Sequence, residues 1–163
     1  MIHGINHVAI STPDLERAVR FYRDVLGFAE AERFAWRPGE TVVDRVTELP
    51  RSSADAAVLH AGNLLIELFE FHAPAARPAP PDRRVSDHGI CHIALEVTDI
   101  DGVHRRLSAA GMRFSCEPQT LWDGTRISYG RDPDRNVVEL QQLPDAANAM
   151  WLPALHGNAD RRG

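Results

Sequence analysis

Residues 4–10 read Gly-Ile-Asn-His-Val-Ala-Ile, and residues 89–95 read Gly-Ile-Cys-His-Ile-Ala-Leu. The two stretches repeat each other 85 residues apart, and the same offset carries Asp14-Leu15 onto Asp99-Ile100. A repeat of this kind marks a supersecondary unit that is used more than once along a chain. The sequence therefore predicts two similar modules in tandem.

Each half of the chain has the pattern of a strand, then a helix, then further strands. Apolar residues at helical spacing predict helices over residues 13–26 and 100–110, with Thr12 as the cap of the first. Gly27 and Gly111 follow these helices as stop signals. The returning strands are expected at residues 28–34, 56–60, 64–71, 112–116, 126–130 and 137–142. The predicted fold class is α+β, with two βαβββ modules.

Composition along the chain suggests where the modules end. Residues 72–86 are rich in Pro, Ala and Arg and lack periodicity, which is typical of a linker. Residues 36–54 are additional in the first module, and their valines at roughly helical spacing predict a short helix that would cover the concave face. The predicted organisation is a first module at 1–71 with a lid-like insertion at 36–54, a linker at 72–88, a second module at 89–143 and a C-terminal tail at 144–163.

The overall composition excludes several classes of protein. The 163 residues are 44% hydrophobic, which is sufficient for a core, and the net charge of −5 is unlike that of nucleic-acid-binding proteins. The sequence has no apolar run of membrane-spanning length and no signal-peptide pattern. Cys91 and Cys116 are too few for a disulfide framework, and both are expected to be small buried hydrophobes. We expect a cytoplasmic protein without nucleic-acid or membrane partners.

Four ionisable residues interrupt short apolar runs that otherwise resemble strands: His7, Glu67, His92 and Glu139. Each module supplies one histidine from its first strand and one glutamate from its last. If those strands are neighbours, each pair is adjacent, and a pseudo-twofold axis between the modules would bring the two pairs together. Two imidazoles and two carboxylates suit one divalent cation, either Zn, Ni, Co, Mn or Fe(II). These four residues are the predicted metal ligands.

Strand alternation also predicts which side chains share a face with the ligands. Glu70 lies on the opposite face from Glu67, so the repeat favours Glu67 as the ligand. The candidate pocket residues are Phe69, Glu96 and Gln141 on the same face, with Trp36 and Trp122 on adjoining loops. The remaining histidines are expected at the surface or in local hydrogen bonds: His3, His60, His72, His88, His104 and His156.

These motifs resemble the vicinal oxygen chelate superfamily, which includes glyoxalase I, methylmalonyl-CoA epimerase, extradiol dioxygenases and bleomycin-binding proteins. The resemblance covers residues 4–143. It rests on the two histidine runs, on Phe21-Tyr22 through Phe28, and on residues 62–68 and 132–140. It implies an open, cup-shaped mixed sheet around one metal, with the four predicted ligands matching the ligand positions of the superfamily. A glutamate at position 67 is similar to glyoxalase I, whereas dioxygenase-like members usually have no ligand there.

Three functions remain open from the sequence. The first is a metal-dependent isomerase, epimerase or lyase of the glyoxalase type, acting on a small molecule that chelates the metal through vicinal oxygens. In that reaction Glu67 or Glu139 would be the catalytic base. The alternatives are an Fe(II)-dependent extradiol-type dioxygenase and a binding or resistance protein without turnover. A homodimer is the expected assembly, and the cup could close within one chain or across the dimer.

Overall fold

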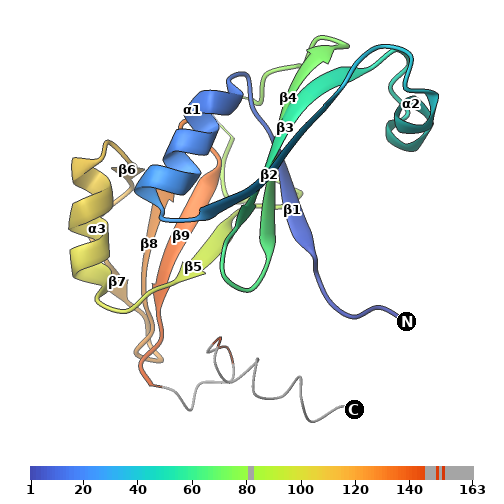
Figure 1. Cartoon of the computed structure of the whole chain (residues 1–163). Helices are drawn as coiled ribbons and strands as arrows, with labels where there is room; N and C mark the ends of the chain where they lie inside the picture. Colours follow the sequence, from blue (N-terminus) through green and yellow to red (C-terminus); the bar gives the residue numbers. More distant parts are fainter. Residues whose placement is uncertain (81–82, 146–149, 151, 153–163) are drawn as a thin grey trace. The chain divides into compact units, whose positions relative to one another are not determined.

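The structure is a computed structural model that describes residues 1–80, 83–145, 150 and 152. The chain divides into two compact units, Met1–Pro81 and Asp82–Gly163, and the boundary falls within the predicted linker. Each unit contains one mixed sheet and one principal helix (Figure 1). The predicted α+β class is confirmed. In the described residues no helix is both long enough and apolar enough to cross a membrane.

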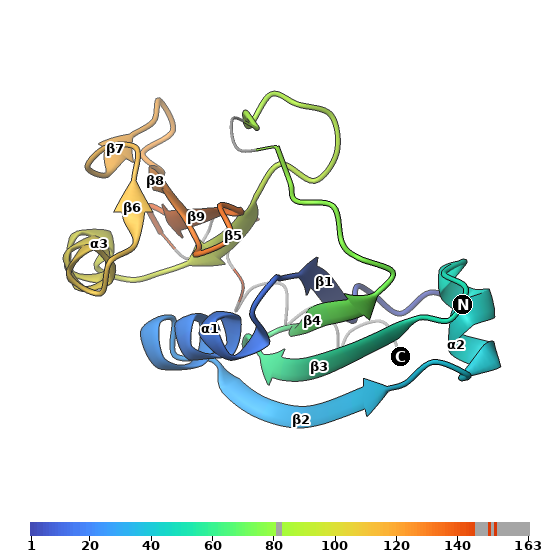
Figure 2. The same cartoon turned by 90° about the horizontal axis from the view of Figure 1, so that it is seen from above.

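The first unit contains a four-stranded sheet in the order β1-β4-β3-β2 (Figure 2). Its elements are β1 (His7–Ser11), α1 (Leu15–Arg20), the π-helical turn η1 (Phe21–Val25), β2 (Ala29–Trp36), α2 (Thr41–Thr47), β3 (Ser53–His60) and β4 (Leu65–Ala73). The first strand, β1, pairs in parallel with the last, β4, and the other pairs are antiparallel. The sequence-based expectation that first and last strands are neighbours is therefore confirmed in this unit.

The second unit repeats this arrangement with shorter strands. Its elements are β5 (Ile93–Glu96), α3 (Ile100–Ala109), β6 (Arg113–Phe114), β7 (Gln119–Thr120), β8 (Arg126–Arg131) and β9 (Val137–Gln142). The strand order is β5-β9-β8-β6, β7 also pairs with β8, and β5 is parallel to β9. The register agrees with the repeat, because Ala9 pairs with Glu67 and Ala94 pairs with Glu139.

The principal helix of each unit covers one face of its sheet and leaves the other face for the ionisable residues. In the first unit the buried residues Ile66 and Leu68 of β4 lie on the face that α1 covers, whereas Glu67 points the other way. In the second unit Val138 and Leu140 of β9 are buried in the same way, and Glu139 lies between them in sequence. Strand alternation thus separates the core from the candidate site.

Replacing Leu68 by alanine should lower the free energy of unfolding by about 2–5 kcal/mol, because Leu68 is fully buried and the change leaves a cavity. Urea denaturation would measure this loss. Val42→Ala on α2 is the matched control, since Val42 is 70% exposed and the change should stay within about 0.5 kcal/mol. Equal effects of the two substitutions would contradict the assignment of the core.

The first helix starts at a different capping residue from the one that the sequence predicted. The cap of α1 is Asp14, whose carboxylate accepts the Arg17 N–H at 2.9 Å, and the prediction of Thr12 was wrong. Thr12 instead accepts the N–H of Asp14 through its hydroxyl, so the helix starts two residues later. Asp99 caps α3 by accepting the N–H of Gly102. The two aspartates are related by the 85-residue offset, so the cap is part of the repeat.

A second contact fixes each helix to the last strand of its unit. The backbone N–H of Leu15 donates to Glu70 at 2.8 Å, and the N–H of Ile100 donates to Gln142 at 2.7 Å. These acceptors satisfy helix N–H groups that have no partner within the helix. Glu70 therefore has a structural role on the helix face, which supports Glu67 as the residue that faces the site.

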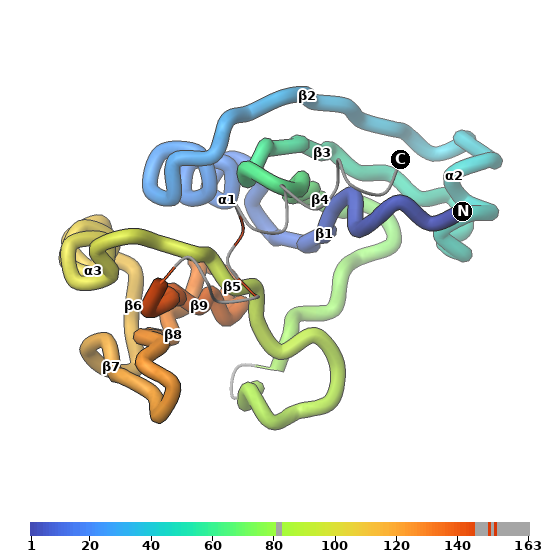
Figure 3. Tube along the Cα trace, turned by 90° about the horizontal axis from the view of Figure 1, so that it is seen from below, coloured from blue at the N-terminus to red at the C-terminus, as the bar shows by residue number. Residues whose placement is uncertain are grey.

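The insertion in the first unit forms the predicted short helix, but it does not cover the sheet. None of the side chains of α2 is buried. The helix lies beyond the ends of β2 and β3 rather than over either face of the sheet (Figure 3). Val42 and Val46 are 70% and 79% exposed because they have no apolar surface of this unit beneath them.

The burial of two cysteines and of one histidine differs from the sequence-based expectation. Cys91 is partly exposed and Cys116 is exposed, so neither is a buried hydrophobe. His104, expected at the surface or in a local hydrogen bond, is buried in α3 against the ring of Phe114, with ring centroids 4.2 Å apart, and its Nδ1 lies 3.3 Å from Oε2 of Glu117. The helical stripe of α3 turns His104 towards the core. His156 lies outside the described residues.

Candidate metal centre

The first histidine–glutamate pair forms where β1 runs beside β4. His7 is the first residue of β1, and its Nε2 lies 3.3 Å from Oε2 of Glu67. Glu67 pairs in the sheet with Ala9, which has its side chain on the same face as His7. The two side chains are thus diagonal neighbours on adjacent parallel strands. Each remains partly open to solvent.

The second pair has the same construction. Nε2 of His92 lies 3.0 Å from Oε2 of Glu139, and the Glu139 side chain is only 8% exposed. His92 directly precedes β5, which begins at Ile93, so the strand starts just after the histidine that was expected within it. The position of the imidazole relative to Glu139 is nevertheless the one that the repeat predicts.

The residue before each histidine contacts the other ring nitrogen. Nδ1 of His7 lies 3.0 Å from Oδ1 of Asn6, and Nδ1 of His92 lies 3.1 Å from Sγ of Cys91. An amide oxygen can only accept a hydrogen bond, so in the His7 contact Nδ1 is the donor. In the neutral tautomer with this proton, the lone pair of Nε2 faces Glu67 and is available to a cation. Such a partner on the second ring nitrogen is a general feature of metal-binding histidines.

The distances within each pair fit two ligands of a common cation. An imidazole nitrogen and a carboxylate oxygen 3.3 Å apart can share either a proton or a metal ion. Two donor atoms that each lie about 2.1 Å from one cation are about 3.0 Å apart at octahedral angles and about 3.4 Å apart at tetrahedral angles. The separations of 3.3 Å and 3.0 Å fall in this range. Both pairs therefore suit a divalent metal.

Each pair by itself supplies two ligands. Within the part of the chain that the structure describes, no three His, Cys, Asp or Glu side chains gather around one possible metal position. The union of the two pairs in one four-ligand centre therefore stays a prediction.

The second pair has a third member that the sequence did not reveal. Tyr129 on β8 pairs with Glu139 in the sheet, so the two side chains are neighbours on one face, where Tyr129 partly opposes the effect of burial on the pKa of the Glu139 carboxyl group. The Tyr129 ring lies beside the imidazole of His92, with ring centroids 5.2 Å apart. In the first unit the corresponding position is Val58, which pairs with Glu67. The two pairs thus differ in their surroundings although their geometry is similar.

Burial raises the pKa of Glu139 above its usual value, and the neighbouring His92 and Tyr129 only partly oppose this effect. A raised pKa means that the folded protein binds the proton more tightly than the unfolded chain does. The resulting stabilisation is fully present below the unfolded pKa, about 4.3, and is lost as the pH rises through the folded pKa.

For metal-free protein, Glu139→Gln should therefore gain stability relative to the native sequence as the pH rises from about 4 to 7. Thermal denaturation of both proteins across this range in the presence of a chelator would measure the difference. A difference that does not change with pH, or that favours the native sequence as the pH rises, would contradict the raised pKa.

The five predicted pocket residues lie in different surroundings in the structure. Trp36 was expected on a loop but is the last residue of β2, and it meets Phe69 on the Glu67 face of the first sheet, with ring centroids 5.9 Å apart. Gln141 lies two residues beyond Glu139 on β9, on the same face. Glu96 accepts a hydrogen bond from the backbone N–H of Leu152 at 2.8 Å. Trp122 is 93% exposed in the turn between β7 and β8.

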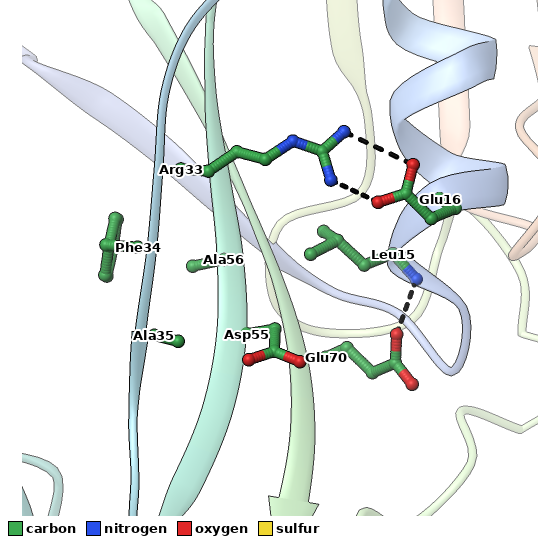
Figure 4. Close-up of a pocket in the computed structure, with 8 residues that line it drawn as sticks. All are labelled: Leu15, Glu16, Arg33, Phe34, Ala35, Asp55, Ala56 and Glu70. Carbon is green, nitrogen blue, oxygen red and sulfur yellow. Dashed lines mark hydrogen bonds and ion pairs between the residues drawn. The ribbon is translucent and has the colours of Figure 1, made fainter.

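A separate cavity of about 430 Å³ lies on the opposite face of the first sheet, beside α1 (Figure 4). It is lined by Leu15, Glu16, Arg33, Phe34, Ala35, Asp55, Ala56 and Glu70. Its charged groups are already paired: Arg33 with Glu16, Glu70 with the N–H of Leu15, and Asp55 with Arg37 and His72. This cavity is therefore a less suitable candidate site than the histidine–glutamate faces.

Comparison with known proteins agrees with this description. Residues 4–140 match the family model of the glyoxalase/bleomycin resistance protein/dioxygenase superfamily. A 2-epi-5-epi-valiolone epimerase from an Actinomyces species is 33% identical over 151 residues, which cover 88% of this chain and 81% of the relative. An ethylmalonyl-CoA/methylmalonyl-CoA epimerase from Cereibacter sphaeroides is 34% identical over 150 residues, covering 88% of this chain and all of the relative.

A solved structure of a glyoxalase family protein from Bacillus cereus has the same fold. It superposes with a TM-score of 0.75 at 24% identity and covers 85% of this chain and 92% of its own. The matched family model, the epimerase relatives and the repeated histidine–glutamate geometry lead to one conclusion. The chain belongs to the glyoxalase/bleomycin resistance protein/dioxygenase superfamily.

Proposed function

We propose that the protein is a metal-dependent epimerase or related isomerase that moves a proton at the carbon next to a carbonyl group. The observation that carries the proposal is the repeated pair, with Nε2–Oε2 separations of 3.3 Å for His7–Glu67 and 3.0 Å for His92–Glu139. The relatives named as epimerases, at 33% and 34% identity, support the same class of reaction.

The four residues would act together at one centre. His7 and His92 would hold the cation through Nε2, with Asn6 and Cys91 setting the orientation of the rings. A divalent cation bound there would polarise the substrate carbonyl and make the neighbouring proton more acidic. The substrate would be a small molecule that offers two vicinal oxygens.

Proton transfer would then be the task of the two glutamates. An epimerase must remove a proton from one side of a carbon and return one to the other side, which requires two positioned acid–base groups or one that can reach both sides. The repeat supplies one carboxylate per module, which matches this requirement. In the second module the hydroxyl of Tyr129 would keep the Glu139 carboxylate oriented while its protonation changes.

Exchange with deuterated solvent tests this proposal. Protein reconstituted with Co(II), Mn(II), Ni(II) or Zn(II) would be incubated in D₂O with methylmalonyl-CoA, ethylmalonyl-CoA and 2-epi-5-epi-valiolone, the compounds named for its relatives. Proton NMR would follow the loss of the signal next to the carbonyl. Metal-dependent deuterium entry is expected with at least one substrate. Oxygen consumption with catechols and no exchange with any of these substrates would favour the dioxygenase alternative instead.

A further inference from the structure

Four aromatic side chains cover the sheet of the first unit beside the His7–Glu67 pair. Phe34 and Trp36 come from β2, and Phe69 and Phe71 come from β4. Neighbouring ring centroids are between 5.7 and 6.5 Å apart, and Trp36 meets both β4 rings edge-on. We call this group of four rings the aromatic layer.

The aromatic layer lies on the same face of the sheet as Glu67. Phe69 and Phe71 follow Glu67 on β4 at intervals of two residues, so their side chains alternate to the same side, about 7 and 14 Å along the strand. Between the two pairs of rings, β3 contributes only Ala54 and Ala56, both almost completely buried. The small side chains allow the rings to lie close to the backbone, which leaves an apolar surface directly beside the ligand pair.

One ring of the layer is fixed by the inserted helix. The indole N–H of Trp36 donates to the hydroxyl of Ser52 at 2.9 Å, and that hydroxyl donates to Asp44 of α2 at 2.7 Å. Asp44 also accepts the backbone N–H groups of Arg51 and Ser52, each at 2.8 Å. These hydrogen bonds hold the pKa of Asp44 below its usual value, so the acceptor remains charged. Ser52 and Asp44, which are not part of the aromatic layer, thereby fix the orientation of the Trp36 ring.

The exposed area of the layer suits a small molecule better than a protein. Phe34 is 38% exposed and the other three rings are less exposed. Even if all four were as exposed as Phe34, rings of about 200 Å² would offer only about 300 Å² together. A standard protein interface buries about 800 Å² on each partner.

The strands beneath this face carry little positive charge, which favours an uncharged ligand portion over the layer. Within the four strands of the first unit the only arginine or lysine is Arg33, and its guanidinium pairs with Glu16 of α1 on the opposite face. Arg37, which directly follows β2, pairs with Asp55. A phosphate group over the layer would find no cationic partner on these strands. A flat, uncharged ring would instead stack on rings and meet ring edges, which are favourable contacts for an aromatic group.

We infer that the aromatic layer binds a flat, uncharged, ring-shaped portion of the substrate, and that Asp44 and Ser52 are positioning residues that orient Trp36 for it. The inference rests on the proposed function, since the chelating oxygens of the same molecule would lie at the His7–Glu67 pair. Phe69 lies about 7 Å along β4 from Glu67, so the ring of the substrate should be only a few bonds away from its chelating oxygens.

Binding of two matched α-hydroxy acids tests this inference. Mandelate and lactate chelate through the same two oxygens but carry a phenyl and a methyl group. Calorimetry with Co(II)-loaded protein should give mandelate at least a tenfold tighter Kd. Phe69→Leu should reduce this preference at least fivefold and leave the Kd for lactate unchanged. Phe28→Leu is the matched control, because the Phe28 ring packs near Tyr22 rather than in the layer, and the preference should persist.

Variants of Asp44 test whether this residue positions Trp36, again by the preference for mandelate over lactate. Asp44→Ala should reduce the mandelate preference, Asp44→Asn should restore most of it, and Asp44→Ala should have no further effect in a Trp36→Phe background. A purely structural role of Asp44 would instead weaken both acids alike and would not depend on the indole N–H. That result would overturn the assignment of Asp44 and Ser52.

The outcomes separate this inference from the proposed function. Equal affinities for the two acids, binding of neither acid, or a preference unaffected by Phe69→Leu would overturn the inference even if solvent exchange is observed. A mandelate preference lost in Phe69→Leu would support it even if no substrate exchanges its proton. If Phe69→Leu changes the oligomeric state measured by light scattering, the layer is a contact between copies and the inference is wrong.

Discussion

Replacing Glu139 by glutamine should slow exchange of the substrate proton with solvent by about 10²–10⁴-fold, the usual contribution of a general base. Glutamine keeps the size of the side chain and an oxygen near His92, but it cannot take up a proton. Burial of the native carboxylate favours its protonated form, so Glu139 is well suited to accept the proton. The measurement is the rate of deuterium entry at saturating metal, with metal content determined in the same sample.

Glu70→Gln is the matched control for this substitution. Glu70 lies on the same strand as Glu67 but on the helix face, where its carboxylate accepts the N–H of Leu15. Gln142 makes the equivalent contact in the second unit, so a glutamine can perform this task. The control should retain the native exchange rate. A Glu139→Gln variant that exchanges at the native rate, with metal bound, would exclude Glu139 as the base.

Replacing either His7 or His92 by alanine should weaken metal binding by more than about 100-fold, the upper effect expected from the loss of an outer-shell partner alone. Each imidazole faces its glutamate through Nε2, and alanine leaves one fewer ligand. Competition with a metal-binding dye would give the affinities. His72→Ala is a suitable comparison, since His72 binds Asp55 on the face of the first sheet opposite to Glu67 and its loss should leave metal affinity unchanged.

Replacing the residue that contacts Nδ1 of either histidine should reduce metal affinity by a smaller factor. Asn6 and Cys91 contact Nδ1 of the two histidines, and loss of such a partner typically costs 10–100-fold in affinity. An affinity that is unchanged in His7→Ala or in His92→Ala would show that the corresponding imidazole is not a ligand.

The sequence predicted the parts of this molecule that depend on periodicity. The repeat around His7 and His92, the neighbouring first and last strands, and the proximity of each histidine to its glutamate all follow from strand alternation and the 85-residue offset. Gly27 and Gly111 were predicted as helix stops, and both adopt positive φ angles after their helices. Such features are local or repeated, so the pattern alone contains them.

Features that depend on tertiary contacts could not be predicted in this way. Tyr129 reaches Glu139 only because β8 and β9 pair in one particular register, and a single tyrosine in an apolar run carries no sign of that. The bond from Glu96 to Leu152 joins residues 56 positions apart. The sequence could have indicated the roles of Asn6 and Cys91, because the two residues occupy the same position in the repeat. However, an amide and a thiol share no chemistry that would suggest a common task.

The inserted segment shows the limit of helical spacing as a guide. The valines of α2 predicted a helix correctly, but an apolar stripe does not reveal which surface it covers. The connection of this segment to the sheet is instead polar, through Asp44 and Ser52 to the indole of Trp36. Hydrogen bonds of this kind involve common residue types at irregular spacing, and they become visible only in the structure.

The measurement that tests the central claim most directly is the metal content of protein purified without added metal, alongside His7→Ala and His92→Ala. If the two histidine–glutamate pairs form one centre, the native protein should contain about one divalent ion per chain, and each single variant should lose all of it. Two separate two-ligand sites would contradict this account, and each variant would then lose only the ion of its own pair and keep the other.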